Sequence, residues 1–368
     1  MNRAIPFFNY PQIYLSHKKE YNDLITDVLS RGAFINQKDI TEFEYDIAHY
    51  LGVKHAIGVA NCTDGLTIAL KAAGIQNGDE VIFPSHTFVA TAEAIVNNNG
   101  IPVPADIASD HTIDPNDIMK RITKKTKFIM PVQLNGRTSN MDPIMKIANE
   151  YNLTIIEDSA QSLGAKYKGK FAGTFGRASS FSFYPAKILG AFGDAGIIIT
   201  NDDDIAQKSR FLKDHGRNEK NEVVLWGMNS RLDNLQAAIL KFQFSFFNIT
   251  INRRRAIAEL YNNNLKNIPQ LTLPPGPDSS TDYFDVFQNY EIEAENRDGL
   301  KSHLADCGIG TLIQWSGKAV HQFEQLGLKV SLPFTEKMFT RCLMLPMHVY
   351  LSDDDIYYIT EKIIKFYE

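Results

Sequence analysis

Short apolar segments alternate with helix-like segments between residues 55 and 158, and this alternation limits the folds that the chain can adopt. The apolar runs occupy residues 55–60, 80–83, 102–104, 126–131 and 153–158. Repeated strand–helix units of this kind favour a mostly parallel sheet that is covered by helices. Functional groups of an open α/β sheet lie at the carboxyl ends of its strands, and Asp158 ends the last of these runs.

The length of the chain indicates a second, smaller domain. Its 368 residues exceed the size at which one hydrophobic core stops growing. A helical lead-in is expected over residues 21–51, and a long helix is expected from about residue 232 to residue 265, before the turn-rich segment 273–277. We predict a large α/β domain over residues 1–250 and a smaller α+β domain over residues 251–368.

Charge, hydropathy and cysteine content exclude several classes of protein. The formal net charge of -5 argues against a generally basic nucleic-acid binder. No stretch supplies the roughly 20 uninterrupted apolar residues of a membrane helix, and the first residues lack the apolar core of a signal peptide. Cys62, Cys307 and Cys342 are widely spaced and form no CxxC pair. We therefore predict a cytoplasmic protein with reduced thiols, no metal site, no membrane span and no nucleic-acid partner.

Lys187 and Asp158 are the first candidates for chemistry. Lys187 lies in a glycine-bearing loop between two apolar segments, 179–183 and 193–200. Most lysines are solvated surface charges, so Lys187 alone is weak evidence. Asp158 ends a strongly apolar strand, where a buried carboxylate needs a cationic partner, and a protonated pyridine nitrogen is such a partner. The alternative is that Asp158 caps the next turn or pairs with a structural arginine.

A polar turn at residues 61–65 follows the first apolar strand and precedes a helix that we expect from Leu66 to Ala73. Its backbone N–H groups, the Thr63 hydroxyl and the helix dipole are suited to binding a phosphate. An ordinary helix N-cap is the more common use of these residue types, so both interpretations are kept.

Ordered motifs over nearly the whole chain resemble those of the DegT/DnrJ/EryC1/StrS aminotransferases, the nucleotide-sugar branch of the aspartate aminotransferase-like fold. The resemblance implies a large domain that binds pyridoxal phosphate on a mostly parallel, seven-stranded type of sheet, together with a small α+β domain. Cys62 and Ala195 depart from the usual family residues, but both are small. The matching segments are residues 5–7, 32–35, 43–44, 61–66, 84–91, 141–144, 157–161, 180–183 with Lys187, 193–196, 227–231 and 236–238.

The resemblance implies a role for several residues. Lys187 matches the lysine that holds pyridoxal phosphate as a Schiff base and then moves the proton between cofactor and substrate. Asn229 matches a residue that reaches the cofactor of a neighbouring subunit, which implies a homodimer with composite active sites. Arg231, in the same loop, serves either structure or substrate. The other implied cofactor contacts are Asp158 at the pyridine nitrogen, Gln161 near the ring hydroxyl, Phe88 on the ring face, and Cys62, Thr63 and Ser182 at the phosphate.

The implied reaction takes an amino group from L-glutamate, releases 2-oxoglutarate, and passes the group through pyridoxamine phosphate to a nucleotide-linked keto-sugar. The expected setting is bacterial surface-glycan synthesis, such as that of lipopolysaccharide O-antigen. Amination at C-4 is preferred because it is frequent in the family, and the alternative is C-3 amination of a dTDP-3-keto-6-deoxyhexose. A dehydratase and a non-catalytic cofactor-binding regulator are further alternatives, and Lys187 argues against the dehydratase.

Candidate sugar or nucleotide contacts come from two further segments and from Arg231. The alternative role of Arg137 is a surface salt bridge. The alternative role of Trp315 is to pack in the hydrophobic core. The full set of candidate substrate contacts is Asn135, Arg137, Arg231, Trp315, Lys318 and His321.

Overall fold

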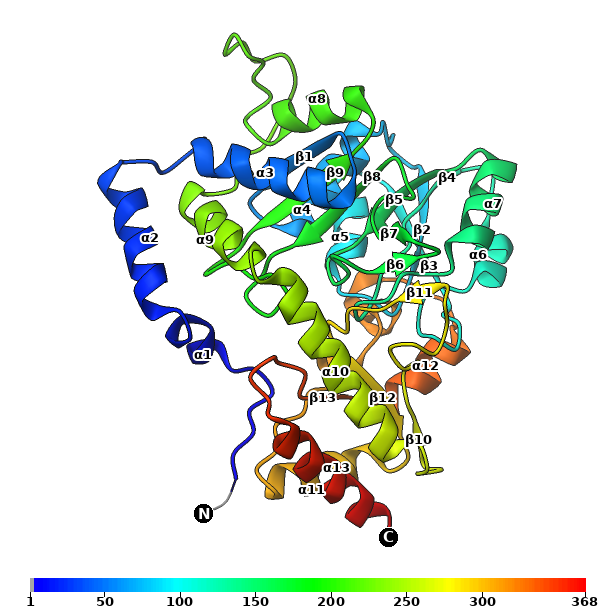
Figure 1. Ribbon diagram of the computed structural model, residues 1–368. Helices are drawn as coiled ribbons and strands as arrows, with labels where there is room; N and C mark the ends of the chain where they lie inside the picture. Colours follow the sequence, from blue (N-terminus) through cyan, green and yellow to red (C-terminus); the bar gives the residue numbers. More distant parts are fainter. Residues whose placement is uncertain (1–2) are drawn as a thin grey trace.

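The computed structural model describes residues 3–368 and is built around a seven-stranded sheet (Figure 1). The strand order is β1-β9-β8-β5-β4-β2-β3. Neighbouring strands from β8 to β3 are parallel, whereas β9 is antiparallel to both of its neighbours. The predicted mostly parallel sheet is therefore confirmed. The strands are β1 (His55–Val59), β2 (Glu80–Pro84), β3 (Ile101–Ala105), β4 (Thr126–Ile129), β5 (Thr154–Asp158), β8 (Ala178–Ser182) and β9 (Gly196–Thr200).

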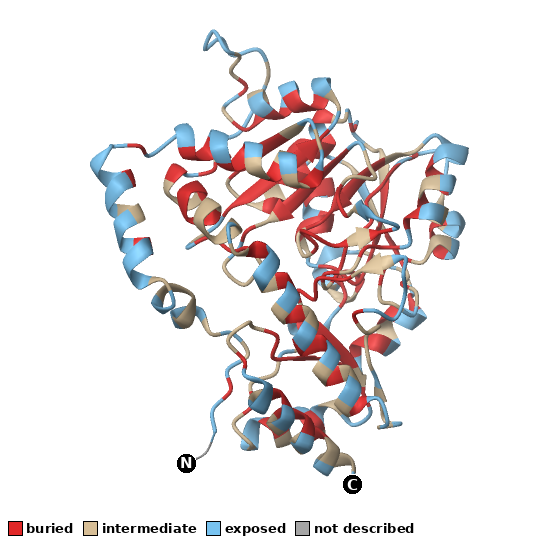
Figure 2. Cartoon of the chain, in the orientation of Figure 1, coloured by how far each residue is buried: buried red, intermediate tan, exposed pale blue. Residues whose placement is uncertain are grey.

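Helices cover both faces of the sheet, because alternate side chains of a strand point to opposite sides. In β9, Ile198 packs in the apolar layer of α4, α5 and α8, whereas Ile197 and Ile199 pack in the layer of α3 and α9. Buried residues accordingly concentrate in and around this sheet (Figure 2). The helices are α3 (Lys38–Leu51), α4 (Cys62–Ala72), α5 (Ala90–Val96), α6 (Pro115–Arg121), α7 (Met141–Tyr151), α8 (Asp203–Leu212) and α9 (Asn234–Phe244).

The rest of the chain forms a smaller α+β unit with its own apolar core, as the fold class predicted. A three-stranded sheet in the order β10-β12-β13 packs with α10, α11 and α13 around Tyr261, Tyr290 and Leu343. Its elements are α10 (Phe247–Leu265), β10 (Leu271–Thr272), β11 (Tyr283–Phe284), β12 (Tyr290–Ala294), α11 (Arg297–Asp306), α12 (Pro333–Phe339), β13 (Cys342–Leu345), α13 (Asp353–Tyr367) and the short 3-10 helices Gln314–Gly317, Val320–Gln322 and Glu324–Leu326.

Two contacts, one by strand pairing and one by the N-terminal segment, join the two parts of the chain. Strand β11 pairs with β6 (Lys166–Tyr167), which also pairs with β7 (Lys170–Phe171). The N-terminal segment, which continues into α1 (Tyr10–Leu15) and α2 (Lys18–Ser30), contributes Ile5 to the smaller core, where Ile5 forms a bridge with Ile309. The predicted division at residue 250 falls inside α10 and stays a proposal.

Two helices differ from the sequence-based expectation. Helix α4 begins at Cys62 rather than Leu66, because the side chain of Asn61 accepts the backbone N–H of Asp64 and caps it. The expected single helix over residues 232–265 is two helices, α9 and α10, and the backbone leaves the α-helical path at Phe246. The break allows α9 to pack on α3 while α10 packs on α13. Among residues 3–368, no helix has the length and apolar character needed to cross a membrane.

Candidate active site

A cavity of about 560 Å³ lies at the carboxyl ends of β5 and β8 and at the N-terminus of α4. It brings together residues that are far apart in the sequence, including all of the predicted cofactor contacts except Asn229. Trp315, a predicted substrate contact, also lines it. The predicted residues in the cavity wall are Cys62, Thr63, Phe88, Asp158, Gln161, Ser182, Trp315 and Lys187.

Asp158 is the buried carboxylate of this cavity. Its Oδ2 accepts a hydrogen bond of 2.7 Å from the Thr91 hydroxyl, and its Oδ1 accepts the backbone N–H of Ala160 at 3.1 Å. Since the Thr91 hydroxyl donates to Asp158, the Thr87 hydroxyl 2.7 Å away donates to Thr91. Burial raises the pKa of Asp158, whereas these hydrogen bonds and the charge of Lys187 act against the increase. The site therefore contains an acid that a cationic partner would keep ionised.

Lys187 contributes an amine to the same cavity from the loop that follows β8. Burial lowers the pKa of the Lys187 amine, and the nearby Cys62 and Asp158 partly offset this effect. The loop is held by Gln288, whose side-chain amide donates to the carbonyl of Ala186 and accepts the backbone N–H of Ile188, both at 2.8 Å. Burial thus favours the neutral form of the amine, and hydrogen bonds hold its backbone on both sides.

The N-terminus of α4 forms one end of the cavity and is suited to an anion. The first turn presents free backbone N–H groups beside the Thr63 side chain and Ser182 at the end of β8. A Cβ atom at Gly196 would lie 2.6 Å from the carbonyl carbon of Asn61 and 2.7 Å from the backbone nitrogen of Cys62. Glycine at this position therefore allows β9 to approach the start of α4 closely.

Phe88 and Gln161 complete the wall of the cavity. Phe88 follows β2, and 55% of its surface is exposed, so its ring is available to a planar ligand. The side-chain oxygen of Gln161 accepts the backbone N–H of Asn135 at 2.8 Å. Asn135 has a left-handed backbone with φ of 54° and contacts Glu291 through its Nδ2, so it lies behind the cavity wall. Its predicted contact with substrate stays a prediction.

Asn229 and Arg231 lie between α8 and α9, and part of this segment forms the loop that projects from the top of the view in Figure 1. Asn229 is exposed and does not line the cavity of its own chain. The guanidinium of Arg231 pairs with Asp214 at 3.3 Å, a contact that supports a structural role for this arginine. The predicted role of Asn229 concerns a second copy of the chain and is taken up below.

The remaining predicted substrate residues lie outside the cavity wall. Arg137 pairs with Asp285 at 2.5 Å and lies over the ring of Tyr283 at 3.7 Å. Lys318 is exposed, and His321 is buried with its Nδ1 2.7 Å from the Ser85 hydroxyl. Their predicted contacts with a sugar or nucleotide stay predictions.

The sequence analysis did not identify Thr91, which contacts Asp158, or Gln288, which contacts the Lys187 loop. Thr91 belongs to the matched segment 84–91, so the motif could have drawn attention to it. Gln288 contacts the Lys187 loop from about a hundred residues away in the sequence, and a lone glutamine carries no spacing signal.

The arrangement fits a planar, phosphorylated heteroaromatic aldehyde. The Lys187 amine can attach its carbonyl carbon, the Asp158 carboxylate can hold a protonated ring nitrogen, the N-terminus of α4 can bind its phosphate, and the Phe88 ring can contact its face. Pyridoxal phosphate has all four of these features.

Comparisons with known proteins identify the family. The model of the DegT/DnrJ/EryC1/StrS aminotransferase family matches residues 15–364, and the chain belongs to this family. A "pleiotropic regulatory protein" of Geobacillus stearothermophilus is 39% identical over 99% of this chain and 98% of its own. The dTDP-3-amino-3,6-dideoxy-alpha-D-galactopyranose transaminase of Aneurinibacillus thermoaerophilus is 38% identical over 98% of this chain and 99% of its own.

A solved structure has nearly the same fold. The crystal structure of S. venezuelae DesV in complex with a ketimine intermediate has a TM-score of 0.95 and 34% sequence identity, and the match covers 99% of each chain. The predicted family, the fold class and the assignment as an aminotransferase are thus confirmed.

Proposed function

We propose that this aminotransferase uses pyridoxal phosphate to transfer an amino group from L-glutamate to a keto-sugar carried by a nucleotide. The observation that carries the proposal is one cavity that contains the Lys187 amine, the buried Asp158 carboxylate and the N-terminus of α4. When bound, pyridoxal phosphate supplies an electron sink, and its pyridoxamine form carries the amino group between the two substrates.

Each protein group has a separate task. The negative charge of Asp158 keeps a proton on the ring nitrogen. The hydrogen bonds from Thr91 and Ala160 favour this ionised form of Asp158. Lys187 attaches the cofactor and, once released, holds and moves a proton at its Nζ atom. Since burial lowers the pKa of Lys187, a larger fraction of this amine is neutral and able to accept that proton.

The other cavity residues hold and orient the ligand. The backbone at Cys62, with Thr63 and Ser182, is assigned to the phosphate, and Phe88 is assigned to the ring face. The Gln161 side chain is assigned to the ring hydroxyl, and its oxygen is already oriented by the backbone of Asn135.

For the keto-sugar we favour C-3 amination of a dTDP-linked hexose, which is the alternative that the sequence analysis kept beside C-4. The name of the A. thermoaerophilus relative, with 38% identity over nearly the full length of both chains, specifies an amine at C-3. Trp315 lines the cavity and is the first candidate for a sugar contact. The product would serve a bacterial surface glycan.

A homodimer with shared active sites is part of the proposal. The segment between α8 and α9 exposes a run of large apolar side chains at Val223, Val224, Trp226 and Met228, and Trp226 is 89% exposed. Exposed apolar groups that cluster in this way usually mark an interface. Asn229 follows this run directly, so a second copy that covers the run would lie close to Asn229, which we assign to the partner's cofactor.

The test is an absorbance spectrum of the purified protein before and after addition of L-glutamate. The wild type and a Lys124→Ala control, which changes an exposed lysine, should show a band near the visible edge that glutamate converts to a pyridoxamine band. Lys187→Ala should lose this response. A wild type without a chromophore, even after incubation with pyridoxal phosphate, would refute the proposal.

The name of the G. stearothermophilus relative supports a second candidate, a regulator that binds the cofactor without turnover. The two candidates differ in turnover. For the aminotransferase, the pyridoxamine form made with glutamate should return to its original spectrum when a dTDP-linked 3-keto-hexose is added, with release of an amino sugar. A cofactor bound at Lys187 that responds to no amino donor would favour the regulator.

A further inference from the structure

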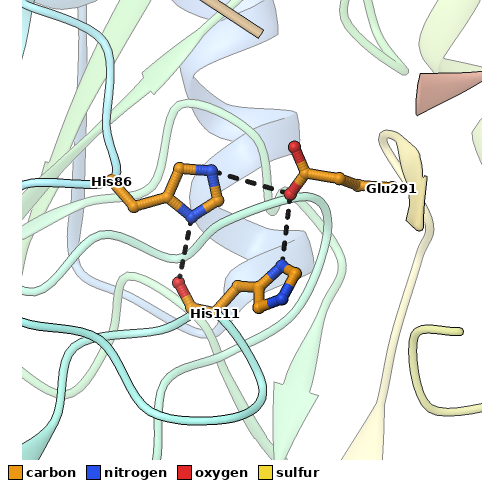
Figure 3. Close-up of side chains that lie close together, drawn as sticks. All are labelled: His86, His111 and Glu291. Carbon is orange, nitrogen blue, oxygen red and sulfur yellow. Dashed lines mark hydrogen bonds and ion pairs between the residues drawn. The ribbon is translucent and has the colours of Figure 1, made fainter. Parts of the chain in front are cut away.

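His86, His111 and Glu291 converge from three separate segments of the chain (Figure 3). His86 follows β2, His111 lies between β3 and α6, and Glu291 lies on β12 of the smaller unit. The His86 Nε2 and the His111 Nδ1 lie 3.6 Å and 3.3 Å from the same oxygen of Glu291. One ligand atom from each residue lies within 4.8 Å of the other two.

Two polar atoms of this cluster are buried without a hydrogen-bond partner in the described part of the chain. They are the Nε2 of His86, a residue with 0% exposure, and the Oε1 of Glu291. A buried polar atom without a partner costs free energy, and such atoms are uncommon in native proteins. The His86 Nε2 faces the Glu291 carboxylate at the centre of the cluster, so a ligand there would satisfy this nitrogen.

The remaining atoms of both imidazoles already have acceptors. The His86 Nδ1 lies 3.4 Å from the backbone carbonyl of His111, and the His111 Nε2 lies 3.2 Å from a carboxylate oxygen of Glu293. Histidines that bind metals usually donate their second ring N–H to a carbonyl or carboxylate, which directs the other lone pair to the ion. Here the other two ring nitrogens, the His86 Nε2 and the His111 Nδ1, both face the Glu291 carboxylate.

We propose that the His86 Nε2, the His111 Nδ1 and the Glu291 carboxylate bind a divalent metal ion of the zinc class. Tetrahedral zinc with ligand bonds of about 2.0–2.1 Å separates its ligand atoms by about 3.3 Å. The two separations of 3.3 Å and 3.6 Å are close to this edge length. Imidazole nitrogen selects zinc and its transition-metal neighbours over calcium and magnesium, which prefer oxygen ligands.

A small cavity beside the cluster has room for a fourth ligand. Its volume is about 50 Å³, and His111, Asn135 and Glu291 are among its lining residues. This space exceeds what one water molecule needs, and the polar lining offers it hydrogen-bond partners. The ion would therefore have three protein ligands and one water.

The ion would join the large α/β unit to the smaller unit. His86 and His111 come from loops of the seven-stranded sheet, whereas Glu291 belongs to the sheet of the smaller unit. Asn135 connects Glu291 to Gln161 in the active-site wall through contacts of 3.0 Å and 2.8 Å. The ring of His86 also lies 5.1 Å from that of Trp315. The ion would thus stabilise the arrangement of the two units around the active site.

Metal content of the purified holoprotein tests the proposal. The protein would be treated with a chelator, incubated with zinc chloride and dialysed, and its zinc would be counted by mass spectrometry. We expect about one zinc ion per chain for the wild type, for His49→Gln, which changes an exposed histidine, and for Cys307→Ser, which changes a thiol 3.9 Å from His303. Glu291→Gln and His111→Gln should retain at least tenfold less zinc.

Equal zinc in the wild type and these two variants would overturn the proposal, as would a wild type that retains none. The latter result would leave a metal-free ion pair of His111 with Glu291 and Glu293. If the variants do not fold, X-ray absorption at the zinc edge of the wild type identifies the ligands of the bound zinc. Two imidazoles with oxygen ligands at about 2.0–2.2 Å are expected, and sulfur at about 2.3 Å would overturn the assignment.

Discussion

Gln288 fixes the loop of Lys187 from both sides, because its amide bonds the carbonyl before Lys187 and the N–H after it, each at 2.8 Å. Gln288 precedes β12 of the smaller unit, whereas Lys187 follows β8 of the large sheet. The position of the proposed catalytic amine therefore depends on how the two units pack. A buried amide with both ends bonded is also costly to remove.

Replacing Gln288 with alanine should lower kcat while the cofactor stays attached. The loss of two hydrogen bonds allows the Lys187 amine to move away from its reactive position, and we expect a decrease of about tenfold to a hundredfold. Steady-state kinetics and the cofactor spectrum measure the two effects. Gln76→Ala, an exposed glutamine bonded to the carbonyl of Gly74, is the matched control. A spectrum without bound cofactor would instead assign Gln288 to cofactor binding.

Thr91→Val should move the acidic limb of the pH–rate profile to higher pH. Burial raises the pKa of Asp158, and the Thr91 hydrogen bond opposes this increase. Without that bond the carboxyl binds its proton at a higher pH, and a protonated Asp158 cannot hold a charged ring nitrogen. The pH dependence of kcat tests this expectation. Thr67→Val, which removes a hydroxyl from α4, should leave the profile in place, and a shift in both variants would count against Asp158 as the cause.

The sheet and the acidic end of its central strand could be predicted because each signal is local. The apolar runs and their turns lie within a few residues of one another, and Asp158 directly ends such a run. The early start of α4 was missed because Gly65 made the segment resemble a turn. In the structure this glycine lies inside the helix, where a Cβ atom would be 2.2 Å from the Ser180 hydroxyl oxygen.

Contacts across long sequence distances could not be predicted in the same way. Gln288 meets the Lys187 loop, and His86 meets Glu291, only because two separate sheets pack together. Neither residue has neighbours at a characteristic spacing. The break between α9 and α10 occurs at Ser245 and Phe246. Neither residue is a glycine or proline, so the sequence shows a continuous helical pattern there.

Gly196→Ala should weaken binding of the cofactor phosphate. The added Cβ atom would contact the backbone of Asn61 and Cys62 at 2.6 Å and 2.7 Å, so the start of α4 has to move. Overpacking of this kind costs about 1–3 kcal/mol. Displacement of the phosphate-binding turn would relieve the clash and weaken its contacts with the phosphate. Titration of the apoprotein with pyridoxal phosphate gives the change in Kd. Gly193→Ala is the control, because its Cβ atom would meet only the flexible Gln236 side chain at 3.3 Å. Equal affinities in both variants would show that this turn does not hold the phosphate.

Asp106→Ala should reduce stability at neutral pH, and the reduction should disappear in acid. The carboxylate of Asp106 accepts the backbone N–H groups of Phe334 and Thr335 and the Thr335 hydroxyl, so it caps α12 from the large unit. Burial acts to raise the pKa of Asp106, but these hydrogen bonds outweigh it and hold the pKa below its ordinary value. A carboxyl with a lowered folded-state pKa stabilises the protein above its ordinary pKa of about 4 and loses that contribution as the pH falls further.

The expected loss on Asp106→Ala is about 1–2 kcal/mol from pH 8 to pH 5, the range for a lost helix cap. Urea unfolding of both proteins across this range and below pH 4 measures the difference. The Oδ1 of Asp114 accepts the backbone N–H of Asn116 and caps α6, which lies in the same unit as Asp114. Asp114→Ala is therefore the matched control. Because Asp106 joins two units, its loss should also lower the cooperativity of unfolding, whereas Asp114→Ala should not. A stability difference that persists unchanged at pH 3 would mean that packing, rather than the charge of Asp106, supports α12.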